Sequence, residues 1–178
     1  MTTPTTVALL RAVNVGGRNK VPMKALRDHM VAAGFTGVRT LLASGNVFFQ
    51  DHPDDPAASL SRIIQDHFGC RVPVVLRSAD AIARAIERCP YPAEERNPKL
   101  LHVGFCTSVP DPALVDRLDP DRSPPDQYTV DGDTIYVDYA DGSARSKLSA
   151  HWFDKQLGCT TTFRNWRTLG KILARARG

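Results

Sequence analysis

The sequence of 178 residues has few of the features that mark membrane, secreted or disulfide-rich proteins. No stretch approaches the roughly 18 consecutive apolar residues of a membrane-spanning helix. The segment at residues 1–6 has neither the positive region nor the apolar region of a secretory signal. The four cysteines are widely spaced and form no CxxC pair, which argues against a disulfide framework or a zinc motif. We therefore expect a cytoplasmic protein with reduced cysteines and no membrane association.

Motifs for catalysis and for cofactors are also missing. Neither GxxxxGK[ST] nor GxGxxG occurs, and the five histidines lie near no recognisable nucleophile motif. The aspartates of residues 111–141 lack the spacing of a calcium-binding loop. We expect no cofactor and no metal site, and the sequence leaves open whether the protein is an enzyme.

Acidic residues are scarce at both ends of the chain. Residues 1–50 contain six Lys or Arg and one Asp, and residues 144–178 contain eight Lys or Arg and one Asp. Residues 111–141, in contrast, hold nine Asp and two Arg. If the two basic ends meet in space, they form a positive patch; otherwise these residues are solvated helix faces.

The hydrophobic pattern of the first half predicts a mixed α+β unit. Residues 6–14 read as a strand that is apolar on both faces, and Pro73 indicates that the last strand lies at a sheet edge. The order of elements is strand, helix, strand, strand, helix, strand, which is typical of a ferredoxin-like unit. These elements are predicted at residues 6–14, 22–34, 38–43, 47–49, 57–69 and 71–77.

The second half repeats this order of elements without obvious sequence identity. A connecting helix at 78–90 and a polar linker at 91–99 suggest domains at residues 1–90 and 91–178. The fold class is therefore α+β, a tandem pair of ferredoxin-like units with an added C-terminal helix. The later elements are predicted as strand 100–107, helix 111–118, strands 127–130 and 134–139, helix 145–157, strand 160–163 and helix 166–176.

The first candidate binding segment, residues 11–22, follows the first strand and contains Gly16 and Gly17 between Arg11 and Lys20. A glycine-containing basic loop that leads into a helix can present backbone N–H groups and positive charge to an anion. The alternative is an ordinary tight turn with surface lysine and arginine. The turn at residues 44–46 is expected at the opposite end of the sheet, so it would contact this loop only if the turn begins later than predicted.

The second candidate segment, residues 160–171, joins the last strand to the last helix. Asn165 is a candidate N-cap, and Arg164 and Arg167 would favour an anion at the first turn of the helix. Trp166 could stack on a base or another planar ligand. The alternative is that Trp166 belongs to the core and Arg164 packs across it.

Several ordered motifs resemble a bacterial family known as domain of unknown function 1697. They are Leu9-Leu10-Arg11-Ala12-Val13-Asn14-Val15-Gly16-Gly17, Lys20-Val21-Pro22-Met23, Gly34-Phe35, Val38-Arg39-Thr40, Ser44-Gly45-Asn46-Val47, residues 72–78, Ser146-Lys147-Leu148 and residues 162–168. The resemblance implies tandem ferredoxin-like units and no established activity. Two positions depart from the family pattern: Ala12, where glycine is common, and Arg167, where asparagine is common.

Three functions are compatible with these features. The leading hypothesis is a binding protein for an anionic ligand, a nucleotide-like small molecule or nucleic acid, at a basic site shared by both units. An enzyme acting on a phosphorylated or carboxylated small molecule, through Lys20 or Lys147, is the second. An oligomeric structural or interaction protein that uses exposed sheet edges is the third, and the sequence does not give an oligomeric state. The predicted ligand-binding residues are Arg11, Asn14, Gly16, Gly17, Lys20, Arg39, Arg164, Asn165, Trp166 and Lys171.

Overall fold

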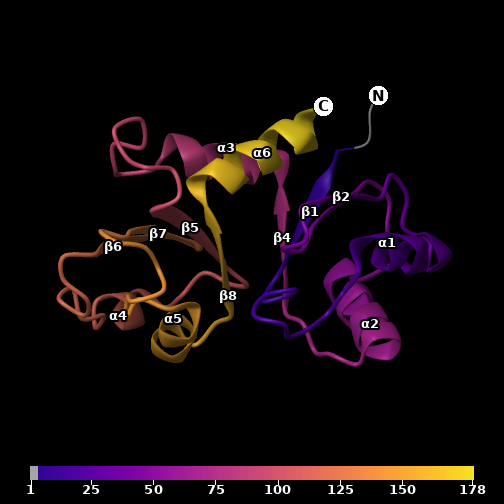
Figure 1. The fold of residues 1–178 in the computed structure, drawn as a ribbon, viewed down its shortest axis with the longest axis horizontal. Coiled ribbons are helices and arrows are strands. Elements are labelled where there is room, and N and C mark those ends of the chain that lie inside the picture. The colour runs from indigo at the N-terminus through magenta and orange to yellow at the C-terminus, as the bar shows by residue number, and fades with distance from the viewer. Residues whose placement is uncertain (1–3) are drawn as a thin grey trace. The chain divides into compact units, whose positions relative to one another are not determined.

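A computed structural model describes residues 4–178 and forms two units, each with its own antiparallel sheet (Figure 1). The first unit contains residues 4–82 and Ile172–Gly178, and the second contains Ala83–Lys171. The division falls within helix α3 (Ala79–Glu87) and within helix α6 (Trp166–Arg177). The predicted α+β class and the tandem ferredoxin-like units are confirmed, including the C-terminal helix.

The first unit has the predicted order of elements. Its sheet has the strand order β2-β3-β1-β4, in which every neighbouring pair is antiparallel. Strand β4 therefore lies at an edge, as the proline at position 73 predicts. The elements are β1 (Thr6–Leu10), α1 (Met23–Ala32), β2 (Arg39–Leu41), β3 (Asn46–Phe49), α2 (Pro56–Phe68) and β4 (Val74–Ser78).

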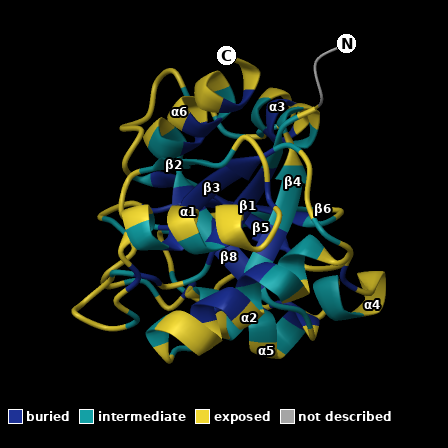
Figure 2. Ribbon diagram, turned by 90° about the vertical axis from the view of Figure 1, so that its right-hand side faces the viewer, coloured by how far each residue is buried: buried dark blue, intermediate teal, exposed yellow. Residues whose placement is uncertain are grey.

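The core of the first unit lies between its sheet and the helices α1 and α2. Alternate residues of β1 and β3 face these helices, since side chains along a strand point to opposite faces in turn. The intervening residues Val7, Leu9 and Phe48 are also fully buried, so β1 has no polar face. In Figure 2 both strands are coloured as buried. The helix-facing core contains Ala8, Leu10, Val47, Phe49, Leu26, Met30, Leu60 and Ile64.

The second unit has the same strand order, β6-β7-β5-β8. Helix α5 packs its buried residues Phe153 and Leu157 against Ile135 and Val137 of the sheet. The elements are β5 (Leu101–Cys106), α4 (Pro112–Val115), β6 (Gln127–Asp131), β7 (Thr134–Asp138), α5 (Ala150–Leu157) and β8 (Thr161–Asn165).

Several predicted boundaries are wrong for local reasons. Strand β1 ends at Leu10 rather than at residue 14, because the backbone becomes left-handed at Ala12 and Asn14. Helix α5 begins at Ala150 rather than at residue 145, because Ser149 Oγ accepts the N–H of Trp152 at 3.2 Å and acts as the N-cap. Strand β4 begins at Val74 rather than at residue 71. Pro73 has no N–H to donate, and the Val72 carbonyl accepts a hydrogen bond of 3.1 Å from Ser61 Oγ.

The turn between β2 and β3 lies at the sheet end where β1 finishes, contrary to our expectation. Strands β1 and β2 are both antiparallel to β3, so they run in the same direction. The turn that follows β2 must therefore reach the end where the chain leaves β1. The Leu10 N–H donates to the Gly45 carbonyl at 2.8 Å, which fixes this contact.

Candidate ligand-binding site

Three segments of the first unit meet where β1 ends. The loop at residues 11–22 leaves the strand there, the turn at residues 42–45 lies beside it, and residues 71–73 enter β4. The Arg11 N–H donates to the Pro73 carbonyl at 3.1 Å, so the loop is held on two sides. We call this arrangement the β1-end site.

The outer part of the loop is a short hairpin. The N–H of Asn14 donates to the carbonyl of Asn19 at 3.0 Å, and the N–H of Arg18 donates to that of Val15 at 3.1 Å. Gly16 and Gly17 have φ angles of +59° and +75°, as a type I′ turn requires at both central residues. These glycines shape the turn, and its tip is exposed.

The side chain of Asn14 joins the loop to its surroundings. Its Nδ2 donates to the carbonyls of Val21 at 2.9 Å and Ala43 at 2.7 Å, and its Oδ1 accepts the Val21 N–H at 2.9 Å. On the other arm, Asn19 Nδ2 donates to the Ala12 carbonyl at 3.1 Å. The structure thus places the predicted ligand residue Asn14 at the base of the loop, with both polar atoms of its side chain bonded to the protein.

Left-handed backbone is concentrated in this region. Ala12, Asn14 and Asn19 have φ angles of +53°, +54° and +47°, and Leu42 in the facing turn has +60°. Asparagine tolerates such angles, whereas alanine and leucine are strained by them, and strained backbone of this kind is enriched at ligand-binding sites. Gly45, at +82°, packs directly beneath the loop, where an added Cβ would lie 2.5 Å from Val13 Cγ2.

A cavity of about 540 Å³ lies between the loop and the turn. Lys20 is its one charged lining residue and is exposed. Among residues 4–178, Lys20 forms no salt bridge. The lining consists of Asn14, Lys20, Val21, Pro22, Met23, Thr40, Leu42 and Ala43.

The predicted residue Arg39 lies away from this cavity. It lines a second cavity of about 480 Å³ in the same unit, together with Thr5, Gln50, Ser78 and Arg177. Its guanidinium carbon is 5.8 Å from the centroid of the Phe48 ring, a cation–π distance. The structure therefore separates Arg39 from Lys20, although β2 contributes its next residue, Thr40, to the first cavity.

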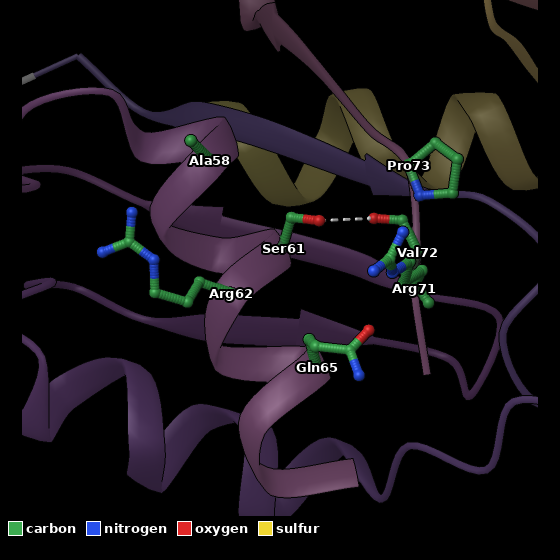
Figure 3. A pocket seen from close by; sticks show the side chains of 7 residues that line it. All are labelled: Ala58, Ser61, Arg62, Gln65, Arg71, Val72 and Pro73. Carbon is green, nitrogen blue, oxygen red and sulfur yellow. Dashed lines mark hydrogen bonds between the residues drawn. The ribbon is translucent and has the colours of Figure 1, made fainter. Parts of the chain in front are cut away.

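A third cavity, of about 490 Å³, lies between α2 and the segment that enters β4. The hydrogen bond between Ser61 and Val72 crosses its wall (Figure 3). Arg62 and Arg71 both belong to the lining, but Figure 3 shows their side chains extending in different directions. The lining of this cavity is basic, but its two guanidinium groups do not point toward one common position.

In the second unit, β8 continues directly into α6, as the sequence predicts. Asn165 Oδ1 accepts the N–H of Thr168 at 2.8 Å, which confirms Asn165 as the N-cap. Arg164 is buried, and its Nη1 donates to Thr162 Oγ1 at 3.0 Å and to the Phe163 carbonyl at 2.8 Å. Burial lowers the pKa of Arg164 to about 10. Trp166 is half-buried, and Arg167 and Lys171 are exposed.

This junction has its match in the first unit at β4 and α3, rather than at the loop after β1. Arg77 pairs with Val7 and Arg164 with Val103, at equivalent places in the two sheets. Each arginine donates from Nη1 to the carbonyl of the preceding residue at 2.8 Å. Ser78 then caps its helix as Asn165 does. The loop lies where the first strand of its sheet ends, whereas the Asn165 junction lies at the end of its own sheet where the first strand begins. One ligand site shared by both units stays a prediction.

The apolar part of the first cavity is what sequence reasoning missed. Leu42 and Ala43 carried no recognised signal, although Thr40 and residues 44–46 belong to motifs that were noted on either side of them. The correct direction of β2 would have placed this turn beside the loop.

Residues 4–178 contain no cluster of three or more His, Cys, Asp or Glu able to hold a metal ion. None of the helices in these residues is long and apolar enough to cross a membrane.

The fold and the loop together define the class of protein. It has two tandem ferredoxin-like units, and a basic hairpin loop follows the first strand of the first unit. The chain belongs to the family described as protein of unknown function (DUF1697), whose model matches residues 3–136. This confirms the resemblance seen in the sequence.

A solved structure with the same fold is that of the conserved bacterial protein SP0830 from Streptococcus pneumoniae. It is 22% identical in sequence, and the match has a TM-score of 0.70 and covers 99% of this chain and 100% of that chain. At this identity the likeness concerns the fold. No curated protein matches the chain.

Proposed function

We propose that the protein binds a small anionic organic ligand in the cavity of the β1-end site. The observation that carries this proposal is Lys20, the one charged residue on the wall of a cavity of about 540 Å³. Within residues 4–178 its ammonium group has no acidic partner. A lysine in this position supplies a point charge that an anion can neutralise.

The start of α1 strengthens the positive potential around Lys20. Pro22 occupies the N-cap position without a side-chain hydrogen bond, and the first turn contains no acidic residue. The other described helices are capped by side chains, those of Asp55, Ser78, Asp111, Ser149 and Asn165. The unbonded N–H groups and the helix dipole of α1 therefore favour an anion beside Lys20.

The hydrogen bonds of the loop support binding by a preformed site. Asn14 fixes both the start of α1, through Val21, and the facing turn, through Ala43. A site that is already ordered loses less conformational entropy when a ligand binds. The cavity is open to solvent, and its volume of about 540 Å³ falls within the range of small-molecule sites, about 300–1,000 Å³.

Nucleic acid is the less favoured ligand, because its binding usually depends on several phosphate contacts. The cavity lining contains one cationic side chain, that of Lys20. The exposed cationic residue nearest to Lys20 in the sequence is Arg18, at the hairpin tip. A labelled single-stranded oligonucleotide tests this version by fluorescence anisotropy at low and moderate salt. Binding that falls steeply with salt would favour nucleic acid over a small ligand.

The proposal is tested by amide NMR titration with inorganic phosphate, AMP and 2-naphthoate. We expect at least one anion to shift the amides of residues 20–25 and 40–45 in a saturable way. The Lys20→Met variant should lose this response, and Lys20→Arg should keep most of it. Lys155→Met, which removes an exposed lysine of α5, is the matched control and should behave like the wild type.

Absence of saturable shifts with all three anions would overturn the proposal. Saturable shifts that Lys20→Met leaves unchanged would also overturn it, since the charge would then have no role.

A further inference from the structure

We propose that the ligand of the β1-end site is an amphipathic monoanion, an aromatic or branched aliphatic body that carries a single carboxylate. This inference rests on the proposed function and specifies its ligand class. It excludes nucleoside polyphosphates, inorganic phosphate and nucleic acid as the principal ligands.

The composition of the cavity wall carries the argument. Five of its eight residues are apolar, namely Val21, Pro22, Met23, Leu42 and Ala43. Asn14 also lies on the wall, but its amide group is already bonded to Val21 and Ala43. Among the side chains of the lining, the ammonium group of Lys20 and the hydroxyl of Thr40 are the polar groups that remain for a ligand. One cation on a mainly apolar wall matches one negative charge on a mainly apolar molecule.

Leu42 is the second observation. Its side chain is 48% exposed, and its backbone is left-handed with a φ of +60°. Both features are unfavourable for leucine, since the left-handed conformation disfavours a Cβ atom and the exposed side chain stays in water. A ligand with an apolar body that covers Leu42 would remove the second cost.

Met23 gives the apolar wall some ability to adapt. It is partly buried, packs against the core of the first unit, and still reaches the cavity. Methionine has an unbranched and polarizable side chain, which fits ligands of irregular shape. The apolar wall thus combines Val21, which is buried in the core, with the partly buried Met23 and the exposed Leu42.

A polyphosphate fits this wall poorly. Sites for several phosphate charges use several charge-assisted hydrogen bonds, often from arginine forks. The cavity has no arginine in its lining, and the arginines of the other two cavities lie outside it. A single lysine suits a single carboxylate.

The test compares three probes by isothermal titration calorimetry on the full chain: 2-naphthoate, its neutral analogue 2-naphthylmethanol, and inorganic pyrophosphate. We expect 2-naphthoate to bind about tenfold more tightly than 2-naphthylmethanol, the difference that one charge-assisted hydrogen bond provides. Pyrophosphate should bind more weakly than 2-naphthoate. In Lys20→Met the two naphthyl probes should bind equally.

Leu42→Gly separates ligand contact from folding. Glycine adopts the left-handed conformation without strain, so this variant should melt no lower than the wild type. It should nevertheless bind 2-naphthoate several-fold more weakly, because the apolar contact is gone. Leu42→Asn, which also tolerates a positive φ, provides a second folded variant with the same expected loss.

The outcomes distinguish this inference from the proposed function. Pyrophosphate that binds more tightly than 2-naphthoate, through Lys20, would overturn the inference and leave the proposed function standing. Unchanged 2-naphthoate affinity in Leu42→Gly and Leu42→Asn would overturn the inference alone. Equal binding of both naphthyl probes to the wild type would overturn the inference, and no binding of any probe would overturn both.

Discussion

Asn14 Nδ2 donates a 2.7 Å hydrogen bond to the carbonyl oxygen of Ala43, 29 positions further along the chain. Through this bond the loop after β1 and the turn after β2 act as the two walls of one cavity. The left-handed backbone of Asn14 and the direction of β2 both contribute to the contact.

Replacing Asn14 should destabilise the first unit and loosen the cavity. Its side chain makes three hydrogen bonds, each worth about 1 kcal/mol, so Asn14→Gly should lower the free energy of unfolding by about 2–4 kcal/mol. Asn14→Ala should cost about 1 kcal/mol more, because alanine is strained at a φ of +54°. Urea denaturation measures both values. Losses below about 0.5 kcal/mol would show that these bonds do not hold the loop.

Gly45→Ala should be more damaging than its small change in volume suggests. The new Cβ would lie 2.5 Å from Val13 Cγ2 and 2.6 Å from Leu10 Cβ, at a φ of +82°. We expect a loss of at least about 2 kcal/mol from overpacking and backbone strain together. The matched control is Gly170→Ala in α6, where an added Cβ meets open space and should stabilise the helix by up to about 1 kcal/mol. Thermal melts that rank these two variants in the opposite order would contradict the packing described beneath the loop.

The N-cap residues of α3 and α6, a serine and an asparagine, should stabilise their helices to a similar degree. Asn165→Ala removes the acceptor for the Thr168 N–H and should cost about 1 kcal/mol, whereas Asn165→Ser should retain most of the stability. Ser78→Ala should show a similar loss, since Ser78 Oγ accepts the Ala81 N–H at 3.1 Å. Equal stability of Asn165→Ala and the wild type would mean that the capping bond contributes nothing.

The protein should lose stability at alkaline pH partly through Tyr136. Burial raises the pKa of Tyr136 from its ordinary value of 10.0 to about 12, and its hydroxyl donates to the Ala85 carbonyl at 2.8 Å. The folded state therefore favours the protonated phenol. This contribution is fully present below pH 10 and is lost as the pH rises from about 10 to about 12.

Urea denaturation of the wild type and of Tyr136→Phe, between about pH 10 and about pH 12, measures how much of the alkaline loss of stability comes from Tyr136. Burial also raises the pKa of Tyr139, Tyr91 and Tyr128, so Tyr136→Phe should keep some of the slope. The phenylalanine variant should show a shallower fall in stability. An unchanged slope would assign the alkaline loss to other groups.

Much of the fold could be predicted because several single residues have local effects that tertiary packing did not override. Pro73 keeps β4 at an edge, and Gly69 ends α2 with a φ of +68°. The likeness to a solved structure, over 99% of this chain, supports the same overall fold.

The candidate site was only half predictable. Lys20 and the glycines of the hairpin follow from composition and spacing. Leu42 does not, since no propensity rule places leucine in a left-handed turn. The remaining error was geometric: a helix that connects two strands of this sheet returns the chain in the same direction, which brings the next turn back to the loop. Arg39 was misplaced for the same reason, because the start of β2 lies at the other sheet end.

The hairpin at residues 14–19 offers a practical route to follow this cavity. Its two asparagines make the bonds to the body of the protein, while the tip residues 15–18 bond only across the hairpin itself among the contacts identified in residues 4–178. The tip can therefore be exchanged or extended without altering the sheet, as surface loop tips usually tolerate. A fluorophore attached at Val15, which is 59% exposed and lies outside the cavity lining, would leave every lining residue unchanged. The hairpin tip is therefore a suitable place for a spectroscopic label.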